Sequence, residues 1–73
     1  MVLHNNLKEI RLLKNFTQET LAGRIGVTRQ TIIAIEKGKF APSVKLALEL
    51  SHSLEVPFNK LFWLERNHGG KDE

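Results

Sequence analysis

The sequence contains no cysteine among its 73 residues and only three histidines. Without cysteine neither a disulfide nor a thiolate zinc site can form, and reducing surroundings fit the composition. His4, His52 and His68 are too few and too scattered to form a recognisable ligand set. We therefore predict that the protein has no metal and no other cofactor.

Long apolar runs are also absent. No run approaches the ~18 residues of a membrane span, and no apolar signal segment follows Met1. These absences predict a cytoplasmic protein with no membrane partner. The length allows one domain, expected over residues 1–66, with a disordered tail at 67–73. So small a chain buries only about 60% of the surface that its unfolded form exposes, so its stability is marginal unless something else contributes. With disulfides and metal sites excluded, oligomerisation is the remaining means of stabilisation.

Catalytic groupings are missing as well. The sequence has no serine, histidine and acid set at a plausible spacing, no glycine-rich phosphate loop and no pair of facing carboxylates. Glu49 and Glu55 have no partner histidine and are interpreted as solvated surface residues. We therefore expect a protein that is not an enzyme.

Positive charge is concentrated in the first part of the chain. The formal net charge is +3, with eight basic and three acidic residues in 8–45 but three basic and five acidic residues in 46–73. Such asymmetry suits a basic binding face with a neutral or acidic back. Solvated basic faces are common, so the charge alone does not identify a nucleic-acid-binding protein.

Capping residues and apolar spacing predict five short helices. Asn6 is expected to cap the first, with Glu9 completing a capping box, and Thr17, Thr28 and Ser43 are expected to cap the next three. The last begins after Pro57, which the first turn of a helix tolerates. The predicted helices cover residues 7–13, 18–25, 29–37, 44–54 and 58–62.

The apolar residues of these helices predict the core. The expected inward-facing residues are Leu7, Ile10, Leu12, Leu13, Leu21, Ala22, Ile25, Ile32, Ile35, Val44, Ala47, Leu48 and Leu54, with Leu46 and Leu50 beside them. The two ends are short and apolar, and we expect residues 1–4 to pair with residues 62–66 as strands. The predicted fold is mainly α, with a short two-stranded antiparallel β element formed by the chain ends.

Residues 18–37 have the features of two helices that cross steeply through a tight turn. Ala22 is small where the helices must approach, and Gly26 supplies the positive φ that the turn requires. Val27 fills the turn, while Ile32 and Ile35 anchor the second of these helices. Together these spacings predict a helix-turn-helix.

The same residues carry a family resemblance. Thr17-Gln18-Glu19-x-Leu21-Ala22, Gly26-Val27-Thr28-Arg29, Thr31-Ile32, Ile35-Glu36-x-Gly38-Lys39 and Pro42-Ser43 resemble the lambda-repressor-like, Cro-type family, also called the XRE family. The resemblance runs from about residue 7 to residue 62 and is strongest to small single-domain repressors with a strand at each end. It implies a homodimeric transcriptional regulator, a repressor at a palindromic operator, whose third helix lies in the major groove of double-stranded DNA.

Within this resemblance the outward face of the third helix would read the bases. The expected base contacts are Arg29, Gln30, Ile33 and Ala34. Arginine can pair with guanine and glutamine with adenine, whereas Ile33 and Ala34 would contact thymine methyl groups. The alternative for Ile33 and Ala34 is a packing role, although Ile32 and Ile35 already fill the inward positions.

Other matching positions would contact the DNA backbone or hold the helices. The expected backbone contacts are Gln18, Thr28, Thr31, Lys37 and Lys39. Gln18 and Thr31 have the alternative of being solvated helix residues. Phe40 is expected to cover the core, with base stacking as the alternative. Arg11 and Glu36 match a partly buried ion pair of the family, and its role would be structural.

The dimer interface is expected at the acidic C-terminal end, since the basic part must face DNA. Its expected residues are Leu46, Leu50, Pro57, Leu61, Trp63 and Leu64. The alternative for Trp63 is that it caps its own core. We expect no small-molecule ligand, because the core leaves little room for a cavity of ~300 Å³. The alternative function is that of an antitoxin or adaptor that binds a partner protein.

Overall fold

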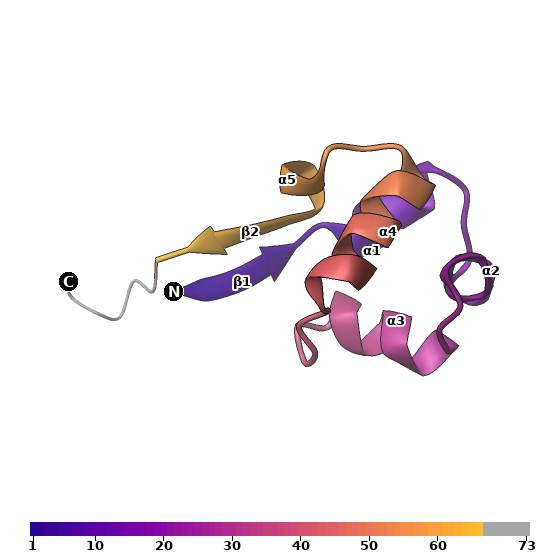
Figure 1. Ribbon diagram of the computed structural model, residues 1–73, viewed down its shortest axis with the longest axis horizontal. Helices are drawn as coiled ribbons and strands as arrows, with labels where there is room; N and C mark the ends of the chain where they lie inside the picture. Colours follow the sequence, from indigo (N-terminus) through magenta and orange to yellow (C-terminus); the bar gives the residue numbers. More distant parts are fainter. Residues whose placement is uncertain (67–73) are drawn as a thin grey trace.

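A computed structural model describes residues 1–66 of the chain. Five helices form one body, and the two ends of the described chain pair as a ribbon that projects from it (Figure 1). The elements in chain order are β1 (Val2–Asn5), α1 (Leu7–Leu13), α2 (Gln18–Ile25), α3 (Arg29–Glu36), α4 (Val44–Leu54), α5 (Phe58–Leu61) and β2 (Phe62–Glu65). The expected fold class is confirmed, including the antiparallel pairing of the ends.

The helices begin where their capping residues predict. The side-chain oxygens of Thr17, Thr28 and Ser43 each accept a hydrogen bond from the N–H three residues further on. Such a bond satisfies one of the free N–H groups at a helix start. The third and fifth helices end one residue earlier than expected, at Glu36 and Leu61.

The cap of α1 differs from the prediction. Asn6 occupies the position before the helix, but its side chain makes no capping hydrogen bond. Instead Asn5 Oδ1 accepts from the N–H of Leu7 at 3.0 Å. The predicted box of Asn6 and Glu9 is therefore wrong, because the residue one position earlier already satisfies the first N–H group of the helix.

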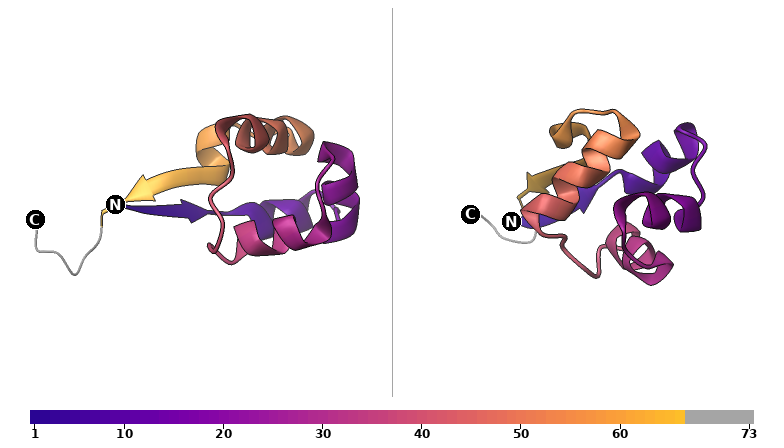
Figure 2. Two further views of the ribbon diagram at one scale, coloured as in Figure 1. Left: turned by 60° about the horizontal axis from the view of Figure 1, so that its bottom comes forward. Right: turned by 45° about the vertical axis from the view of Figure 1, so that its right-hand side comes forward.

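A single apolar core lies between the helices and extends to the base of the ribbon. Its buried residues are Leu7, Leu21, Ala22, Ile32, Ile35, Ala47, Leu50, Leu54, Leu61 and Phe62, with Ile10, Ile25 and Leu46 partly buried against them. α4 faces this core with Ala47, Leu50, Ser51 and Leu54, a helical spacing of three and four residues. Figure 2 shows α4 lying across the other helices.

Four residues predicted to face inward are exposed. Leu12 and Leu13 are 55% and 77% exposed, and Val44 and Leu48 are 74% and 50% exposed. In α1 the buried position four residues after Leu7 belongs to Arg11 instead. Helical spacing identified an apolar stripe on α1 and on α4, but the face of each helix that packs on the core lies to one side of that stripe.

The ribbon pairs Val2 with Glu65, Leu3 with Leu64, His4 with Trp63 and Asn5 with Phe62. Its far end extends well beyond the helices, so the molecule measures 41 × 22 × 21 Å. Opposite each other, His4 and Trp63 stack, and His4 Nε2 lies 2.9 Å from Glu65 Oε1. Only the base of the ribbon, at Phe62, is buried.

Candidate DNA-binding face

The two helices of the predicted motif meet through a three-residue turn. Gly26 has φ +76°, and the N–H groups of Gly26 and Val27 both donate to the carbonyl of Ala22. A residue with a Cβ adopts this conformation only at a cost, which explains glycine at the turn. The turn leaves Ile32 of α3 fully buried against the core and the opposite face of α3 free.

The free face of α3 carries the predicted base-contacting residues. Arg29, Gln30 and Lys37 are exposed, whereas Ile33 and Ala34 are partly exposed. Polar side chains therefore stand at both ends of this face, and two small apolar surfaces lie between them. Such a face offers hydrogen bonds and methyl contacts to the edges of bases in a major groove.

The C-terminus of α3 is closed by a glycine in the left-handed region. Gly38 has φ +74°, its N–H donates to the Ile35 carbonyl, and the N–H of Lys39 donates to the Ala34 carbonyl. These two bonds form a Schellman motif. As a result the exposed side chains of Lys37 and Lys39 lie on either side of a tight bend directly after the helix.

A buried ion pair connects α1 to the end of α3. Arg11 Nε donates to Glu36 Oε2 at 2.6 Å, and the two side chains are only 7% and 5% exposed. Arg11 Nη1 also donates to the carbonyl of Phe16 at 2.8 Å. Two charges taken out of water depend on each other, so this pair fixes the end of α3 relative to α1. The bond to Phe16 adds the loop that leads into α2.

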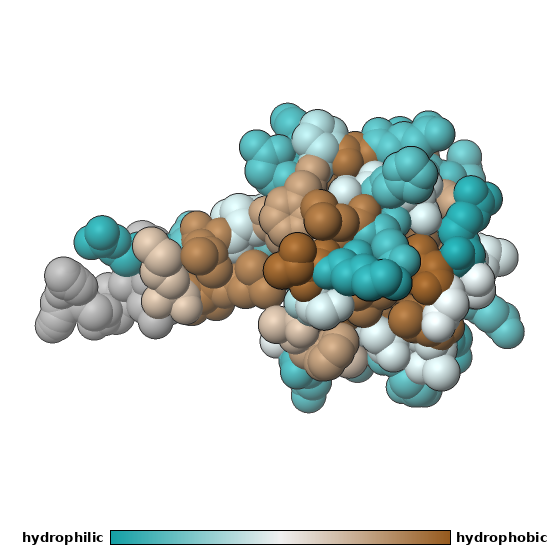
Figure 3. Space-filling model, viewed as in Figure 1, coloured by the Kyte–Doolittle hydropathy of each residue, from teal (hydrophilic) through white to brown (hydrophobic). Residues whose placement is uncertain are grey.

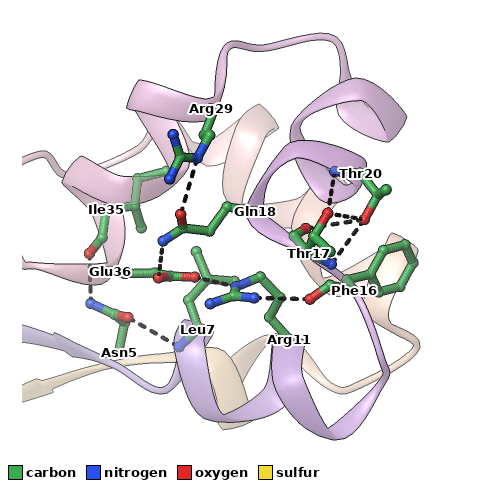
Figure 4. A network of polar contacts seen from close by, with 10 residues as sticks. All are labelled: Asn5, Leu7, Arg11, Phe16, Thr17, Gln18, Thr20, Arg29, Ile35 and Glu36. Atoms are coloured by element: carbon green, nitrogen blue, oxygen red, sulfur yellow. Dashed lines mark hydrogen bonds and ion pairs between the residues drawn. The ribbon is translucent and has the colours of Figure 1, made fainter.

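Gln18 connects the same carboxylate to Arg29 (Figure 4). Its Nε2 donates to Glu36 Oε1 at 3.1 Å, and its Oε1 accepts from Arg29 Nε at 3.3 Å. A carboxylate can only accept, so Glu36 determines which end of the Gln18 amide faces Arg29. Arg29 then keeps both terminal nitrogens for another partner.

Comparison with known proteins gives the same picture. The helix-turn-helix family pattern matches residues 7–61. An HTH-type transcriptional regulator of Methanocaldococcus jannaschii is 51% identical over 63 residues, covering 86% of this chain and 96% of that protein. The chain belongs to the XRE-type helix-turn-helix family. It is therefore a helix-turn-helix transcriptional regulator, which implies that it binds DNA.

Further relatives of this regulator extend the comparison. The HTH-type transcriptional regulator YgzD of Bacillus subtilis is 41% identical over 66 residues, covering 90% of this chain and all of that protein. The restriction-modification controller protein C.AhdI from Aeromonas hydrophila has a similar structure, with a TM-score of 0.70 and 31% identity over 74% of this chain and 78% of that one. A protein from Bacteroides fragilis shares the fold at a TM-score of 0.78 and 24% identity, covering 84% and 98%.

Two of the six residues predicted for the regulator's dimer interface are inaccessible in the single chain. Leu50 and Leu61 have no exposed surface, because both belong to the helical core. Trp63 and Leu64 are 37% and 62% exposed on the ribbon, and Pro57 is also exposed. Packing in the core covers the whole of Leu50 and Leu61, so neither side chain can touch a partner directly.

The sequence did not single out the other exposed apolar residues of this region. Val2 and Leu3 of β1 and Phe58 of α5 are each about two-fifths exposed. Figure 3 shows apolar side chains along the ribbon and at its junction with the helices. The apolar chain ends were the available signal, but only strand pairing shows that they lie beside Trp63 and Leu64.

An open groove lies between α2 and α4 on the regulator's surface. Its volume is about 720 Å³, and it is lined by Arg24, Ile25, Val44, Lys45, Leu48, Glu49, His52 and Ser53. The expectation of little room for a cavity of ~300 Å³ concerned the core, whereas the exposed side chains of α4 form this groove outside the core. That no small molecule binds stays a prediction, and the groove is a place where it can be tested.

Phe40 lies in a second, smaller hollow. The Phe40 side chain is 47% exposed and lines a notch of about 160 Å³ between the ribbon and the loop after α3, together with Leu3, Pro42 and Phe62. It therefore covers the core only in part. No helix in residues 1–66 has the length and apolar character needed to span a membrane.

Proposed function

We propose that this regulator is a repressor that binds a palindromic operator as a homodimer. The observation that carries the proposal is the chain of hydrogen bonds from the buried Arg11–Glu36 pair through Gln18 to Arg29. A long surface arginine is ordinarily free to sample many rotamers. Here the hydrogen bond to Gln18 holds Arg29 at the start of the exposed face of α3. A held side chain favours selective base reading over loose attraction to phosphate.

In this proposal α3 lies in the major groove and its face contacts the bases. The two terminal nitrogens of Arg29 pair with O6 and N7 of a guanine, and Gln30 reaches the next base pairs. Ile33 and Ala34, both partly exposed, contact thymine methyl groups. The side chain of Arg29 thus specifies one base pair, and the apolar pair adds a preference for thymine.

The backbone contacts surround this face. Gln18 lies at the start of α2, where free N–H groups and the helix dipole favour a phosphate. Thr28 and Thr31 lie at the start of α3, and Lys37 and Lys39 flank its end. Contacts of this kind orient the protein on DNA without selecting a sequence.

The proposed homodimer forms through the ribbon. Trp63 and Leu64 supply its centre, Pro57 and the partly buried Leu46 contribute at the base, and Leu50 and Leu61 support it from inside the core. An isolated two-stranded ribbon is marginally stable in water, and a second copy would cover its apolar side chains. The two copies of α3 would then meet half-sites about 34–36 Å apart.

In this proposal the bound dimer represses by excluding other proteins from the same DNA. The second candidate function, an adaptor or antitoxin that holds a partner protein, would use the groove between α2 and α4, where Val44 and Leu48 are exposed. A protein of that kind could also bind DNA. The proposals differ in whether purified protein selects a sequence by itself.

The test is selection of bound sequences from a random DNA pool by the purified protein. We expect two inverted half-sites centred about one helical turn apart. Arg29→Ala should cost about 1–3 kcal/mol on the selected site and relax one position of it. The matched control is Lys39→Ala, which should weaken selected and random DNA alike and reduce the salt slope by about one. Failure to enrich any sequence, or equal losses for Arg29→Ala on both DNAs, would contradict the proposal.

A further inference from the structure

One hydrogen-bonding side chain joins the ribbon to the recognition helix. Asn5 is the last residue of β1 and pairs with the buried Phe62. Its Nδ2 donates to the carbonyl of Ile35 in the last turn of α3 at 2.9 Å. Its Oδ1 accepts from the N–H of Leu7 at the start of α1 at 3.0 Å. Figure 4 shows the amide between the two helices, and three elements thus converge on it.

These two bonds require the chemistry of an amide. The Leu7 N–H needs an acceptor, whereas the Ile35 carbonyl needs a donor, and asparagine offers one of each at fixed geometry. Aspartate would keep the acceptor but would place a second oxygen against the carbonyl. Serine would also keep an acceptor suited to a helix start but has too short a side chain to reach both partners. The cap of α1 and the connection to α3 are therefore chemically separable.

The remaining hydrogen bonds at the base of the ribbon lead elsewhere. The N–H of Asn6 donates to the carbonyl of Leu61 at 2.9 Å, which connects the chain to the end of α5. Phe62 enters the core without a polar contact to α3. Among the hydrogen bonds of residues 1–66, the one from Asn5 to Ile35 is the direct connection between β1 and the helix that carries Arg29.

The length of the ribbon amplifies any change at this joint. At about 3.4 Å per residue, Val2 at the far end of the ribbon lies about 10 Å from Asn5. A tilt of roughly 20° therefore displaces the far end by about 3.5 Å, close to the rise of one base pair. Since the apolar side chains of Val2, Trp63 and Leu64 lie along this arm, a small error at its base changes where a second copy is held.

We propose that Asn5 is a positioning residue that fixes the angle between the ribbon and α3, and thereby the spacing of half-sites that the dimer accepts. This inference rests on the proposed dimerisation through the ribbon. In this inference Asn5 need not contact the DNA or the partner copy. It acts through α3, because its amide holds the carbonyl of Ile35. The next residue in the chain is Glu36, which is bonded to Arg11.

The test uses Asn5→Asp and Asn5→Ser with the selected half-site. Each protein is titrated with duplexes that carry two inverted half-sites at spacings varied one base pair at a time, and with a duplex that carries one half-site. We expect wild type to prefer one spacing. Both variants should bind that duplex about tenfold more weakly and discriminate little between spacings. Their affinity for the single half-site and their sedimentation as dimers should change less than about twofold.

The matched control is Asn6→Ala, since the Asn6 side chain is exposed and reaches only the Lys60 carbonyl, at 3.5 Å. This variant should keep the wild-type spacing profile. Thermal unfolding of all four proteins shows which are folded at the temperature of the titration. The inference is overturned if Asn5→Ser keeps the wild-type profile, or if both Asn5 variants lose single half-site binding in proportion to lost stability. If wild type is a monomer or shows no spacing preference, the proposed dimer itself fails, and the inference fails with it.

Discussion

Glu55 holds a backbone conformation that side chains rarely adopt. Its φ of +57° follows α4, where the N–H of Val56 donates to the Ser51 carbonyl and the N–H of Glu55 to the His52 carbonyl. This is the hydrogen-bond pattern that closes α3 at Gly38, but here without a glycine. Glu55 is exposed, and its carboxylate makes no hydrogen bond or ion pair among those of residues 1–66.

Glu55→Gly should therefore stabilise the fold. Left-handed backbone costs a residue with a Cβ about 1–2 kcal/mol, which exceeds the extra entropy that glycine loses on folding. We expect a net gain of about 1 kcal/mol in the free energy of unfolding, or a rise of about 4–8 °C in Tm. Gly38→Ala is the converse control and should lower Tm, because alanine would be strained at φ +74°. No neighbour lies within contact of the new Cβ, so the loss would report the backbone strain alone. An unchanged Tm for Glu55→Gly would remove the strain argument.

Local signals allowed the sequence to predict most residues that begin and end helices. Thr17, Thr28 and Ser43 bond to N–H groups three residues away, so their role depends only on neighbouring sequence. Asn5 could not be found in this way, because one of its two partners lies thirty residues further along the chain. Glu55 escaped notice because no residue type marks its conformation.

At the scale of helices, the least replaceable contact is the ion pair between α1 and α3. Arg11→Met leaves the carboxylate of Glu36 buried without its cation, and should cost about 3–5 kcal/mol of unfolding free energy. In the double variant Arg11→Met, Glu36→Met no charge is stranded, and most of that loss should be recovered. Denaturant unfolding measures both. If the single variant loses less than 1 kcal/mol, the pair is not effectively buried.

Helix faces were predicted less well than helix positions. Leu12, Leu13, Val44 and Leu48 have helical spacing yet remain exposed. Periodicity identifies a stripe, but the position of the neighbouring helix decides which edge of that stripe is buried. The buried Arg11 could not be predicted from hydropathy at all. The burial of Arg11 was expected only because Arg11 and Glu36 match an ion pair of the family. No local pattern reveals this pair, since its two residues are distant in sequence.

For the whole molecule, exposed apolar side chains occur both on the ribbon and on α4. They provide a matched test of where two copies meet. Leu64→Asp should raise the dimer dissociation constant at least tenfold in sedimentation, because a carboxylate would be buried against the partner's apolar surface. Val44→Asp introduces the same charge at a side chain of similar exposure, 74% against 62%, and should leave the constant unchanged. The reverse result would move the interface to the groove between α2 and α4.

The outward face of α3 was predicted in outline, because outward positions follow from helical geometry once the inward residues are known. With Ile32 and Ile35 buried, Arg29, Ile33 and Lys37 must lie on another side of α3. The interface was harder to predict from sequence. Leu50 and Leu61 satisfy an apolar pattern equally well in a core or on a surface, and only their complete burial distinguishes the two.

Pairing of the chain ends also has a consequence for the order in which the molecule folds. Every strand pair of the ribbon closes a loop of more than fifty residues, whereas the helix-turn-helix joins neighbours. Closing a long loop costs entropy before its contacts compensate for it, so the helices should condense first and the ribbon should zip afterwards. Newly made chains would thus pass through a stage in which the helical body is complete and the ribbon is still unpaired. If two copies meet at the ribbon as proposed, their assembly becomes the last event of folding.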